Sequence, residues 1–343
     1  MSNGTPGIPA RTAQPVSPAR VAVVGQAGRD LVLRVAGIPD AGVSAVVSER
    51  IERLGGKGAS IAVGIRQLDP AAQVSLIAVL GEDGDGTEML REAASHGLDT
   101  RHVVRRGVTA LLTDVVADGG VRRLLEHIPE QALLTPDDVR AATALTTADA
   151  VVLQLQQPFD TLLVAAQLTR QRPANGAPRA LLVLDGAVDA TEDRAGRDEL
   201  VGFADVVRAN AREASMLSGS EVRNREDALR TAETLRDLGP RVVALTVDDA
   251  ELIAWPGDHV FLPHERTRTV DPTGAGDAFV AALTTALLSG ASPREAGQRA
   301  TQAAGASVQR LGGHPRLRRL SPDRKGSMLP STHLPSTDGE TLA

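Results

Sequence analysis

Short runs of apolar, often β-branched residues alternate along this chain with longer stretches of helical periodicity. Strands are predicted at residues 21–24, 74–79, 150–153, 180–184, 205–207 and 242–246, and helices at 58–68, 86–96, 159–170 and 225–238. Short apolar strands separated by amphipathic helices are typical of a parallel sheet with helices on both faces. The sequence therefore predicts an α/β fold.

Two segments, residues 31–54 and 109–128, interrupt this alternation. Both have an extended, alternating character, with turn signals at Pro39-Asp40 and Gly119-Gly120, and neither contains a crossover helix of its own. We expect them to form a small separate β-sheet. Such a sheet would serve as a lid over a site or as a dimer surface.

The two ends of the chain differ from the rest in composition. Residues 1–18 and 321–343 are rich in Pro, Ser, Thr and Gly and have no periodicity, so they are predicted to be disordered tails. No linker divides the remaining residues, 19–320. We expect these to form one domain that carries the function.

Composition excludes several classes of partner. The 37 basic and 43 acidic side chains give a net charge of −6, and the chain has no Tyr, one Trp and four Phe, so nucleic acid is not expected to bind. The longest apolar stretch, residues 278–288, is too short to span a bilayer, and no membrane partner is expected. The absence of cysteine excludes disulfides and Cys zinc sites, and it is compatible with the cytoplasmic location that we expect.

Lysine is almost absent from this arginine-rich chain. Lys57 and Lys325 are its only lysines, against 35 arginines. In such a background a lysine indicates a position that needs a compact ammonium rather than a forked guanidinium, although drift would also leave an isolated lysine. Lys57 lies in the segment LGGKGAS, residues 54–60, whose glycines allow a ligand or another backbone to approach closely at the start of a predicted helix.

The segment VDPTGAGDAF, residues 270–279, carries the strongest chemical signal. Its glycines, Gly274 and Gly276, allow backbone N–H groups to converge where an apolar helix begins, and the helix dipole adds positive potential. Phosphate is the expected guest of such a turn. The same dipole would keep Asp277 ionised, close enough to accept a proton from an alcohol that attacks this phosphate.

A simpler interpretation of this turn also exists. Thr273 would then be an ordinary helix cap and Asp277 a favourable first-turn charge. The turn is not a dinucleotide fingerprint, because Phe279 stands where a third glycine belongs, and the chain has no Walker-type phosphate loop. A nicotinamide enzyme is therefore the weakest of the functions considered.

Together the two glycine-rich segments resemble the paired signatures of the PfkB family of carbohydrate kinases. The resemblance covers about residues 20–315 and includes GEDG at 81–84, the segment 151–158 and the N-x-x-E motif formed by Asn210 and Glu213. It implies a ribokinase-like fold: a doubly wound, mostly parallel sheet with helices on both faces and a small β-sheet lid. In this family the lid commonly joins two subunits, so we expect a homodimer.

The resemblance also implies roles for individual residues. Asp277 corresponds to the catalytic base of the family, and the backbone of Gly274, Ala275 and Gly276 to the anion hole for the transferred phosphoryl group. Such a turn can supply most of the catalysis of phosphoryl transfer, because that reaction depends mainly on positioning and charge stabilisation.

Further positions match substrate, nucleotide and metal sites of the family. The resemblance assigns the sugar site to Asp30, Gly56, Lys57, Ser60 and Gln156. It assigns nucleotide contacts to Asn210 and Thr246, with Glu213 organising Mg²⁺ through water, and a weaker match at Asp271 and Thr273 implies a monovalent cation such as K⁺. The simpler alternative for Asn210 and Glu213 is a helix capping box, and for Asp30 an exposed turn residue.

The sequence departs from the family pattern in the sugar site. The N-x-D sugar motif reads Gly28-Arg29-Asp30, Ser60 replaces the usual asparagine, and Gln156 replaces a sugar-facing glutamate. These changes make ribose itself a doubtful substrate, because a site built to bind a hydroxyl is sensitive to lost partners. Arg29 would favour a phosphorylated or acidic sugar if it faced the site.

A second departure concerns the nucleotide. Where relatives carry T-x-G-x-x-G, this chain has TVDDAE, so Asp248 and Glu251 replace both glycines. Carboxylates beside a triphosphate would repel it, unless they point to solvent at a hairpin tip or engage Mg²⁺. We expect an ATP- and Mg²⁺-dependent sugar kinase; the alternatives are a nucleoside kinase of the same family and a catalytically weak sensor that binds a sugar or nucleotide.

Overall fold

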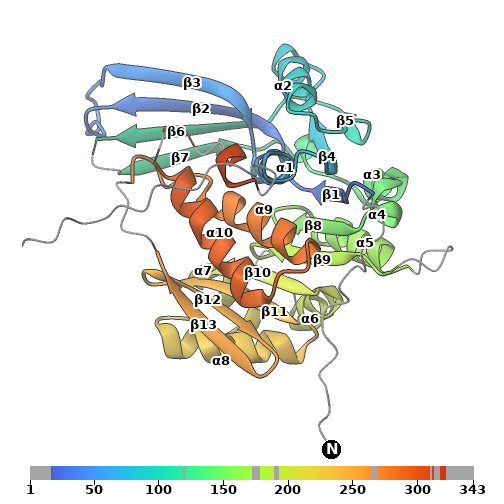
Figure 1. The fold of residues 1–343 in the computed structure, drawn as a ribbon. Helices are drawn as coiled ribbons and strands as arrows, with labels where there is room; N and C mark the ends of the chain where they lie inside the picture. Colours follow the sequence, from blue (N-terminus) through green and yellow to red (C-terminus); the bar gives the residue numbers. More distant parts are fainter. Residues whose placement is uncertain are drawn as a thin grey trace, which may run out of the picture.

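A large sheet runs through the centre of this computed structural model (Figure 1). The structure describes residues 17–118, 121–171, 178–188, 193–264, 269–309, 311–312 and 317–321. In these residues, nine strands pair in the order β13-β12-β11-β10-β9-β8-β1-β4-β5. They are β1 (Arg20–Val24), β4 (Gln73–Leu80), β5 (Val103–Arg105), β8 (Ala150–Gln154), β9 (Leu181–Asp185), β10 (Val206–Asn210), β11 (Val242–Val247), β12 (Ala250–Trp255) and β13 (Asp258–Pro263).

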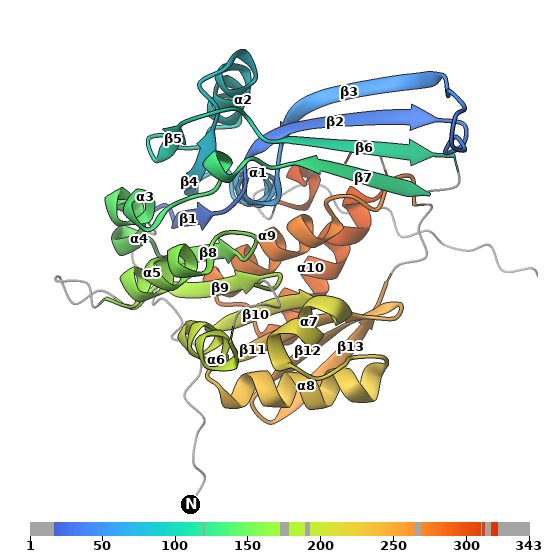
Figure 2. The ribbon, with the colours of Figure 1, turned by 180° about the vertical axis from the view of Figure 1, so that it is seen from behind.

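Helices cover both faces of this sheet (Figures 1 and 2). The residues of one face pack against α1 (Lys57–Leu68), α2 (Gly84–Ser95), α9 (Ala275–Leu288) and α10 (Pro293–Ser307). The residues of the other face pack against α3 (Pro136–Ala141), α4 (Ala144–Thr147), α5 (Phe159–Arg170), α6 (Arg194–Phe203), α7 (Ala211–Ser218) and α8 (Arg225–Asp237). Two short 3₁₀ helices, η1 (Glu130–Ala132) and η2 (Arg318–Leu320), complete the described helices.

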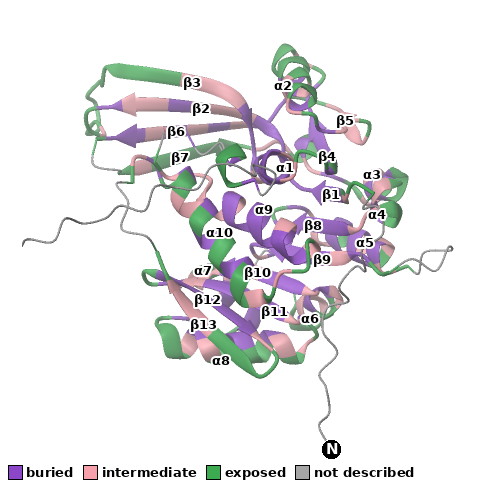
Figure 3. Cartoon of the chain, viewed as in Figure 1, coloured by how far each residue is buried: buried purple, intermediate pink, exposed green. Residues whose placement is uncertain are grey.

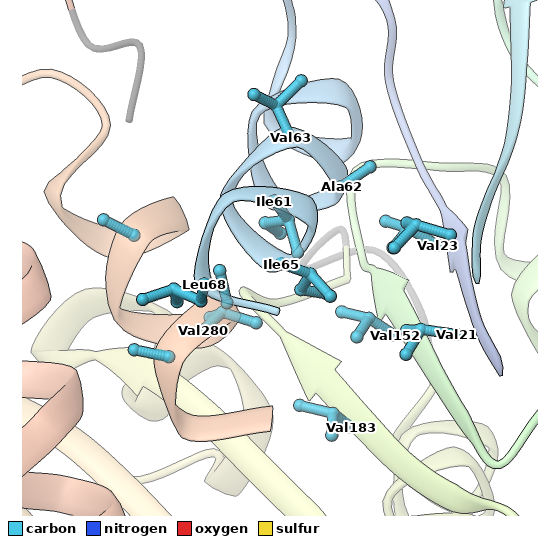
Figure 4. Packing of buried hydrophobic residues seen from close by; sticks show 14 of the residues in the cluster. Val21, Val23, Ile61, Ala62, Val63, Ile65, Leu68, Val152, Val183 and Val280 are labelled. Carbon is cyan, nitrogen blue, oxygen red and sulfur yellow. The ribbon is translucent and has the colours of Figure 1, made fainter. Parts of the chain in front are cut away.

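Alternation along each central strand produces two separate apolar cores. On β1, Val21 and Val23 belong to the core under α1 and α9, whereas Ala22 and Val24 belong to the opposite one. Figure 4 shows Val21 and Val23 beside Ile61 and Ile65 of α1. Because aromatic residues are so few, aliphatic side chains and alanines fill these layers.

The predicted α/β fold is confirmed, and several predicted element limits are close to those observed. The helix predicted at 58–68 is Lys57–Leu68, and the strand predicted at 205–207 is Val206–Asn210. Strands β12 and β13 were not among the predicted strands; they add an antiparallel hairpin to one edge of an otherwise parallel sheet. The large sheet is therefore mostly parallel, as expected, but has an antiparallel edge.

The small separate sheet expected from the two interrupting segments is also confirmed. Its strands are β2 (Gly28–Val35), β3 (Val47–Gly55), β6 (Leu111–Ala117) and β7 (Arg122–His127), paired in the order β3-β2-β6-β7. Figures 1 and 2 show this sheet projecting from the α/β body. Figure 3 shows that much of β3 and β7 is exposed.

The terminal tails predicted at 1–18 and 321–343 lie almost entirely outside the described residues. The limits of the domain at 19–320 stay a prediction. Within the part of the chain that is described, no helix combines the length and the apolar character needed to cross a membrane.

Candidate active site

A cavity of about 360 Å³ opens at the carboxyl ends of the parallel strands. It lies where the strand order reverses, because β1 has β4 on one side and β8, which follows much later in the chain, on the other. Gln26 after β1, Gln156 after β8 and Asp185 at the end of β9 all line it. Such a reversal is where α/β sheets bind their ligands.

The glycine-rich turn before α9 forms one wall of this cavity. Gly274, Ala275, Gly276 and Asp277 all line it. Gly274 adopts a left-handed conformation (φ 76°) at the N-cap position, and no side chain in the described part of the chain caps the helix. The interpretation of Thr273 as the helix cap is therefore wrong, and the first N–H groups of α9, which lack intrahelical acceptors, lie beside the cavity.

The carboxyl of Asp277 is perturbed by its surroundings. Burial, together with the charge of Asp185, raises its pKa to about 7, although Lys57 and Arg208 act in the opposite direction. Burial therefore outweighs the helix dipole, which was expected to keep this carboxyl ionised. A carboxyl whose pKa lies near neutrality is still suited to accept a proton at physiological pH.

The opposite wall is built from the small sheet and the start of α1. Asp30, on β2, lines the cavity, and burial raises its pKa to about 6 in spite of the opposing charge of Arg53. A Cβ at Gly55 would overlap the Asp30 carboxylate, and Gly56 has a φ of 86° with the carbonyl oxygen of Gln26 only 2.7 Å from where its Cβ would be. Both glycines are therefore required for the approach of β2 to the α1 turn.

The other residues of the expected sugar site also reach this cavity. Lys57, Ser60 and Gln156 line it. The Lys57 Nζ lies 3.8 Å from Oε1 of Glu213, and its charge opposes the burial that raises the pKa of both Asp185 and Asp277. The structure thus brings the two glycine-rich segments, more than 200 residues apart in the chain, to one cavity.

Asn210 and Glu213 form the capping box that was the simpler alternative for them. The Asn210 side chain accepts the Glu213 N–H at 2.9 Å, and the Glu213 carboxylate accepts the Asn210 N–H at 2.8 Å. Both residues also line the cavity. The capping box fixes a carboxylate and an amide at the site, so the two interpretations are compatible.

Asp271, unlike the residues above, is not among those that line the cavity. It is fully buried, and its carboxylate accepts the N–H of Thr273 at 2.9 Å and of Gly312 at 2.7 Å. Oγ1 of Thr273 is buried and has no hydrogen-bond partner among the residues that the structure describes. No cluster of three acidic or histidine side chains suited to a metal occurs among the described residues, so the cation role of this loop stays a prediction.

A second cavity of about 220 Å³ adjoins the first. Thr246, Glu251 and His264 line it, and Arg208, Pro272, Ala275 and Gly276 line both cavities. Thr246 donates to the Glu251 carboxylate at 2.9 Å, and His264 Nε2 lies 3.0 Å from it. This hydrogen bond raises the pKa of His264, so the imidazole partly offsets the charge of Glu251.

The acidic side chains of the loop 248–251 point in two directions, some to solvent and one toward this second cavity. Asp248 is exposed at the hairpin tip with a φ of 52°, and Asp249 is exposed and pairs with Arg225 at 2.8 Å. Glu251 instead points inward and is 4% exposed. Only one of the two acids that replace glycines therefore faces the cavity.

Several cavity residues were not identified from the sequence. Asp185 and Arg208 lie in β9 and β10, and Asp114 of β6 pairs with Arg122 of β7 on the small-sheet side. A useful signal existed for Asp185, because polar residues at the carboxyl ends of parallel strands are expected to meet. Arg29, by contrast, pairs with Glu52, Asp85 and Glu88 and is not among the cavity residues.

Comparison with known proteins identifies the family. The sequence model described as "pfkB family carbohydrate kinase" matches residues 18–318. The chain belongs to the PfkB family. It is a carbohydrate kinase, which is a phosphotransferase with an alcohol group as acceptor.

Relatives of this PfkB protein include two characterised kinds of kinase. The ribokinase of Haemophilus influenzae is 28% identical over 75% of this chain and 82% of its own length. The ATP-dependent ribose-1-phosphate kinase of Halopiger xanaduensis is 29% identical over 76% and 82%.

Solved ribokinase structures share the fold. The Thermotoga maritima enzyme superposes with a TM-score of 0.71 at 24% identity, covering 88% of this chain and 97% of that one. The Arabidopsis thaliana enzyme, solved with ribose and ATP, gives 0.69 at 22% identity over 88% and 96%.

Proposed function

We propose that this PfkB protein transfers a phosphoryl group from ATP to a hydroxyl of a neutral sugar, with Asp277 as general base. One observation carries the proposal: a single cavity contains Asp30 and the α1 turn on one wall and the turn 274–277 on the other. A sugar hydroxyl held by Asp30 would then lie between a base and a group of backbone N–H donors.

In the proposed reaction, Asp277 accepts the proton of the acceptor hydroxyl as its oxygen attacks the γ-phosphorus. The N–H groups of Gly274, Ala275 and Gly276 and the positive end of the α9 dipole stabilise the charge on the transferred group. Lys57 contributes a further positive charge. The small sheet acts as a lid that excludes water, which would otherwise accept the phosphoryl group.

Mg²⁺ fits the donor set at the nucleotide side. This ion is usually bound by one or two carboxylates together with substrate phosphates and water, and Asp185 and Glu213 supply carboxylates in the cavity. Bound there, Mg²⁺ would neutralise phosphate charge. We assign K⁺, if it is used, to the loop of Asp271 and Thr273.

The proposed donor is ATP, bound across the second cavity. The Arabidopsis thaliana ribokinase structure contains ATP, and the Cryptococcus neoformans one contains ADP. Thr246 and Asn210 would contact this nucleotide. The Glu251 carboxylate is already engaged by Thr246 and His264, which reduces its repulsion of the phosphates.

A neutral sugar fits the acceptor end better than a phosphorylated one. Asp30, Asp114 and Glu126 line that end, against Arg122 and Lys57. Arg122 is already paired with Asp114, and Arg29 is engaged away from the cavity. An additional phosphate would therefore meet an excess of negative charge.

A coupled assay of ADP formation tests the proposal. The panel holds pentoses, hexoses, their phosphates and nucleosides, each with MgATP. Turnover with a neutral sugar supports the proposal. Preferred turnover of a nucleoside identifies a nucleoside kinase, and ligand binding without turnover of any acceptor identifies a sensor.

The pH dependence of kcat/KM for the sugar should report two carboxylates. Asp30 must be ionised to accept sugar hydroxyl hydrogen bonds and Asp277 to accept the proton, and their pKa values are about 6 and about 7. Log kcat/KM should therefore rise with a slope near two below pH 6 and near one up to pH 7, and become constant above it. Measurement from pH 5 to 9 checks this; in Asp30→Asn the steeper limb should disappear, and a falling profile would contradict the assignment.

We further propose a homodimer joined through the small sheet. Exposed apolar side chains gather on that sheet and its turns: Val43, Val46, Val47, Val121, Leu124 and Leu125. Leu124 also lines the cavity, so the proposed contact uses Leu125 and the exposed valines.

Leu125→Asp should weaken this dimer by at least about 30-fold, since it places an uncompensated charge in an apolar interface. Sedimentation velocity over a concentration series measures the shift. Val108→Asp is the matched control, because Val108 is also exposed but lies outside the sheet strands. A wild-type monomer, or equal dimers of both variants, would contradict the interface.

A further inference from the structure

Arg208 occupies the boundary between the two cavities and lines both of them. It is on β10, between β9 and β11, and its side chain is 12% exposed. Its Nη1 donates to Asp185 at 3.3 Å and its Nη2 to Thr246 at 3.3 Å. The guanidinium thus spans the carboxyl ends of three neighbouring strands.

The same guanidinium lies against the glycine-rich turn. A Cβ at Gly276 would be 2.9 Å from Nη1 and 3.0 Å from Nη2 of Arg208, so the guanidinium packs closely against this glycine. The Cζ of the group also lies over the Phe279 ring, 5.9 Å from its centroid. Arg208 is therefore held against Gly276, one of the residues to whose backbone the proposed function assigns the transferred phosphoryl group.

Arg208 has donors left over. A guanidinium carries five N–H groups, and the hydrogen bonds to Asp185 and Thr246 use two of them. The Nε is buried and has no hydrogen-bond partner among the described residues. The remaining N–H groups of Nη1 and Nη2 are therefore the donors that a ligand in the cavities would use.

The electrostatic surroundings explain why a cation is needed at this point. Burial alone would lower the pKa of Arg208, but Asp185, Glu251, Glu213 and Asp277 together raise it. Without Arg208 these carboxylates would confront an incoming polyphosphate. Glu251 is the one of these carboxylates that stands where the family pattern has glycine.

We propose that Arg208 binds the β- and γ-phosphoryl oxygens of the nucleotide and that it compensates for Glu251 in doing so. This inference rests on the proposed function, because it takes the turn 274–276 as the phosphate site. The planar fork of arginine matches two phosphate oxygens at once, which a lysine ammonium does not. Arg208 and Glu251 thus form a coupled pair at the nucleotide site.

The test is calorimetric titration of MgADP and MgATP, in the absence of sugar, into wild type, Arg208→Met, Glu251→Gly and the double variant. Arg208→Met should weaken binding of both nucleotides by at least about 30-fold, as expected for loss of a charge-assisted bidentate contact. The double variant should bind at least ten times more tightly than Arg208→Met. Arg225→Met is the matched control, because Arg225 pairs with Asp249 on the same hairpin but lines neither cavity, and it should bind as wild type does.

Binding by Arg208→Met within three-fold of wild type, or no recovery in the double variant, would overturn the inference. Thermal unfolding shows which variants are folded. If Arg208→Met does not fold, Arg208→Lys replaces it: about ten-fold weaker binding supports the bidentate contact, and wild-type binding overturns it. Because the titration needs no acceptor, it stays informative if every sugar fails in the turnover assay, which would refute the proposed function alone.

Discussion

Asp277→Asn is expected to lower kcat by about 10³-fold while leaving nucleotide and sugar binding within a few-fold of wild type. Asparagine has nearly the same shape as aspartate but cannot accept the hydroxyl proton. The loss should therefore fall on the chemical step and not on KM. Single-turnover kinetics, with isothermal titration of each substrate, separate these two effects.

The same substitution should make the protein more stable. The pKa of the Asp277 carboxyl is raised from its ordinary value of 3.8 to about 7 by burial and by Asp185. When a group has a higher pKa in the folded than in the unfolded state, the folded protein becomes less stable as the pH rises from the unfolded pKa through the folded pKa. In that range the unfolded chain releases the proton more readily. At pH 8 this loss is complete, and asparagine avoids it, so the free energy of unfolding should rise by about 4 kcal/mol.

Near pH 4 Asp277→Asn should be hardly more stable than wild type, which gives an internal control. Urea unfolding of both proteins at pH 4 and pH 8 measures this difference in the free energy of unfolding. A variant that is inactive and also destabilised at pH 8 would show that Asp277 is a structural residue and not the base. A buried acid kept at a stability cost is what a catalytic position is expected to show.

Local sequence patterns were sufficient to predict the fold and to find the two glycine-rich turns. Each parallel strand is a short apolar run bounded by breakers, and the turn before α9 combines glycines with an apolar helix, so both signals lie within about ten residues of sequence. The same is true of the Asn210 and Glu213 box, whose two partners are three residues apart. These features need no knowledge of which strands are neighbours.

Arg208 could not be found in that way. Its importance depends on β10 lying between Asp185 of β9 and Thr246 of β11, and on contact with Gly276, which is 68 positions further along the chain. A single arginine within a strand has no local signature, and 35 arginines make any one of them unremarkable in the sequence. Which arginine lines the cavity depends on which strands are neighbours in the sheet, and the spacing of residues in the sequence does not give that information.

Glu251 illustrates the reverse problem. The sequence shows that acids replace two glycines, but it does not show which of them points inward. Strand alternation decides this: Glu251 is paired with Thr246 across the β11–β12 hairpin, whereas Asp248 is at its tip. Of the acids in this loop that replace glycines, only Glu251 therefore faces the expected phosphate site. Arg208, Thr246 and His264 lie around its carboxylate.

Lys57→Met is expected to lower kcat/KM for ATP by about 10²- to 10³-fold, the cost of removing one charged donor from a phosphoryl-transfer site. Lys57 is the single lysine of the described residues, and its ammonium lies at the cavity near Glu213, Asp185 and Asp277. Its charge also lowers the pKa of Asp277. Removing it should therefore move the upper inflection of the pH profile to higher pH, a change that a structural role would not produce.

Lys57→Arg decides whether this chain kept a lysine for a physical reason. A guanidinium is larger and directs its donors in a fixed fork, so at the start of α1 it should restore less than a tenth of the activity that Lys57→Met loses. Arg101→Lys is the matched reverse exchange at an exposed arginine paired with Asp99, and it should leave activity within two-fold of wild type. If Lys57→Arg retains activity within three-fold of wild type, a positive charge of any shape suffices, and the retention of lysine in this arginine-rich chain is drift.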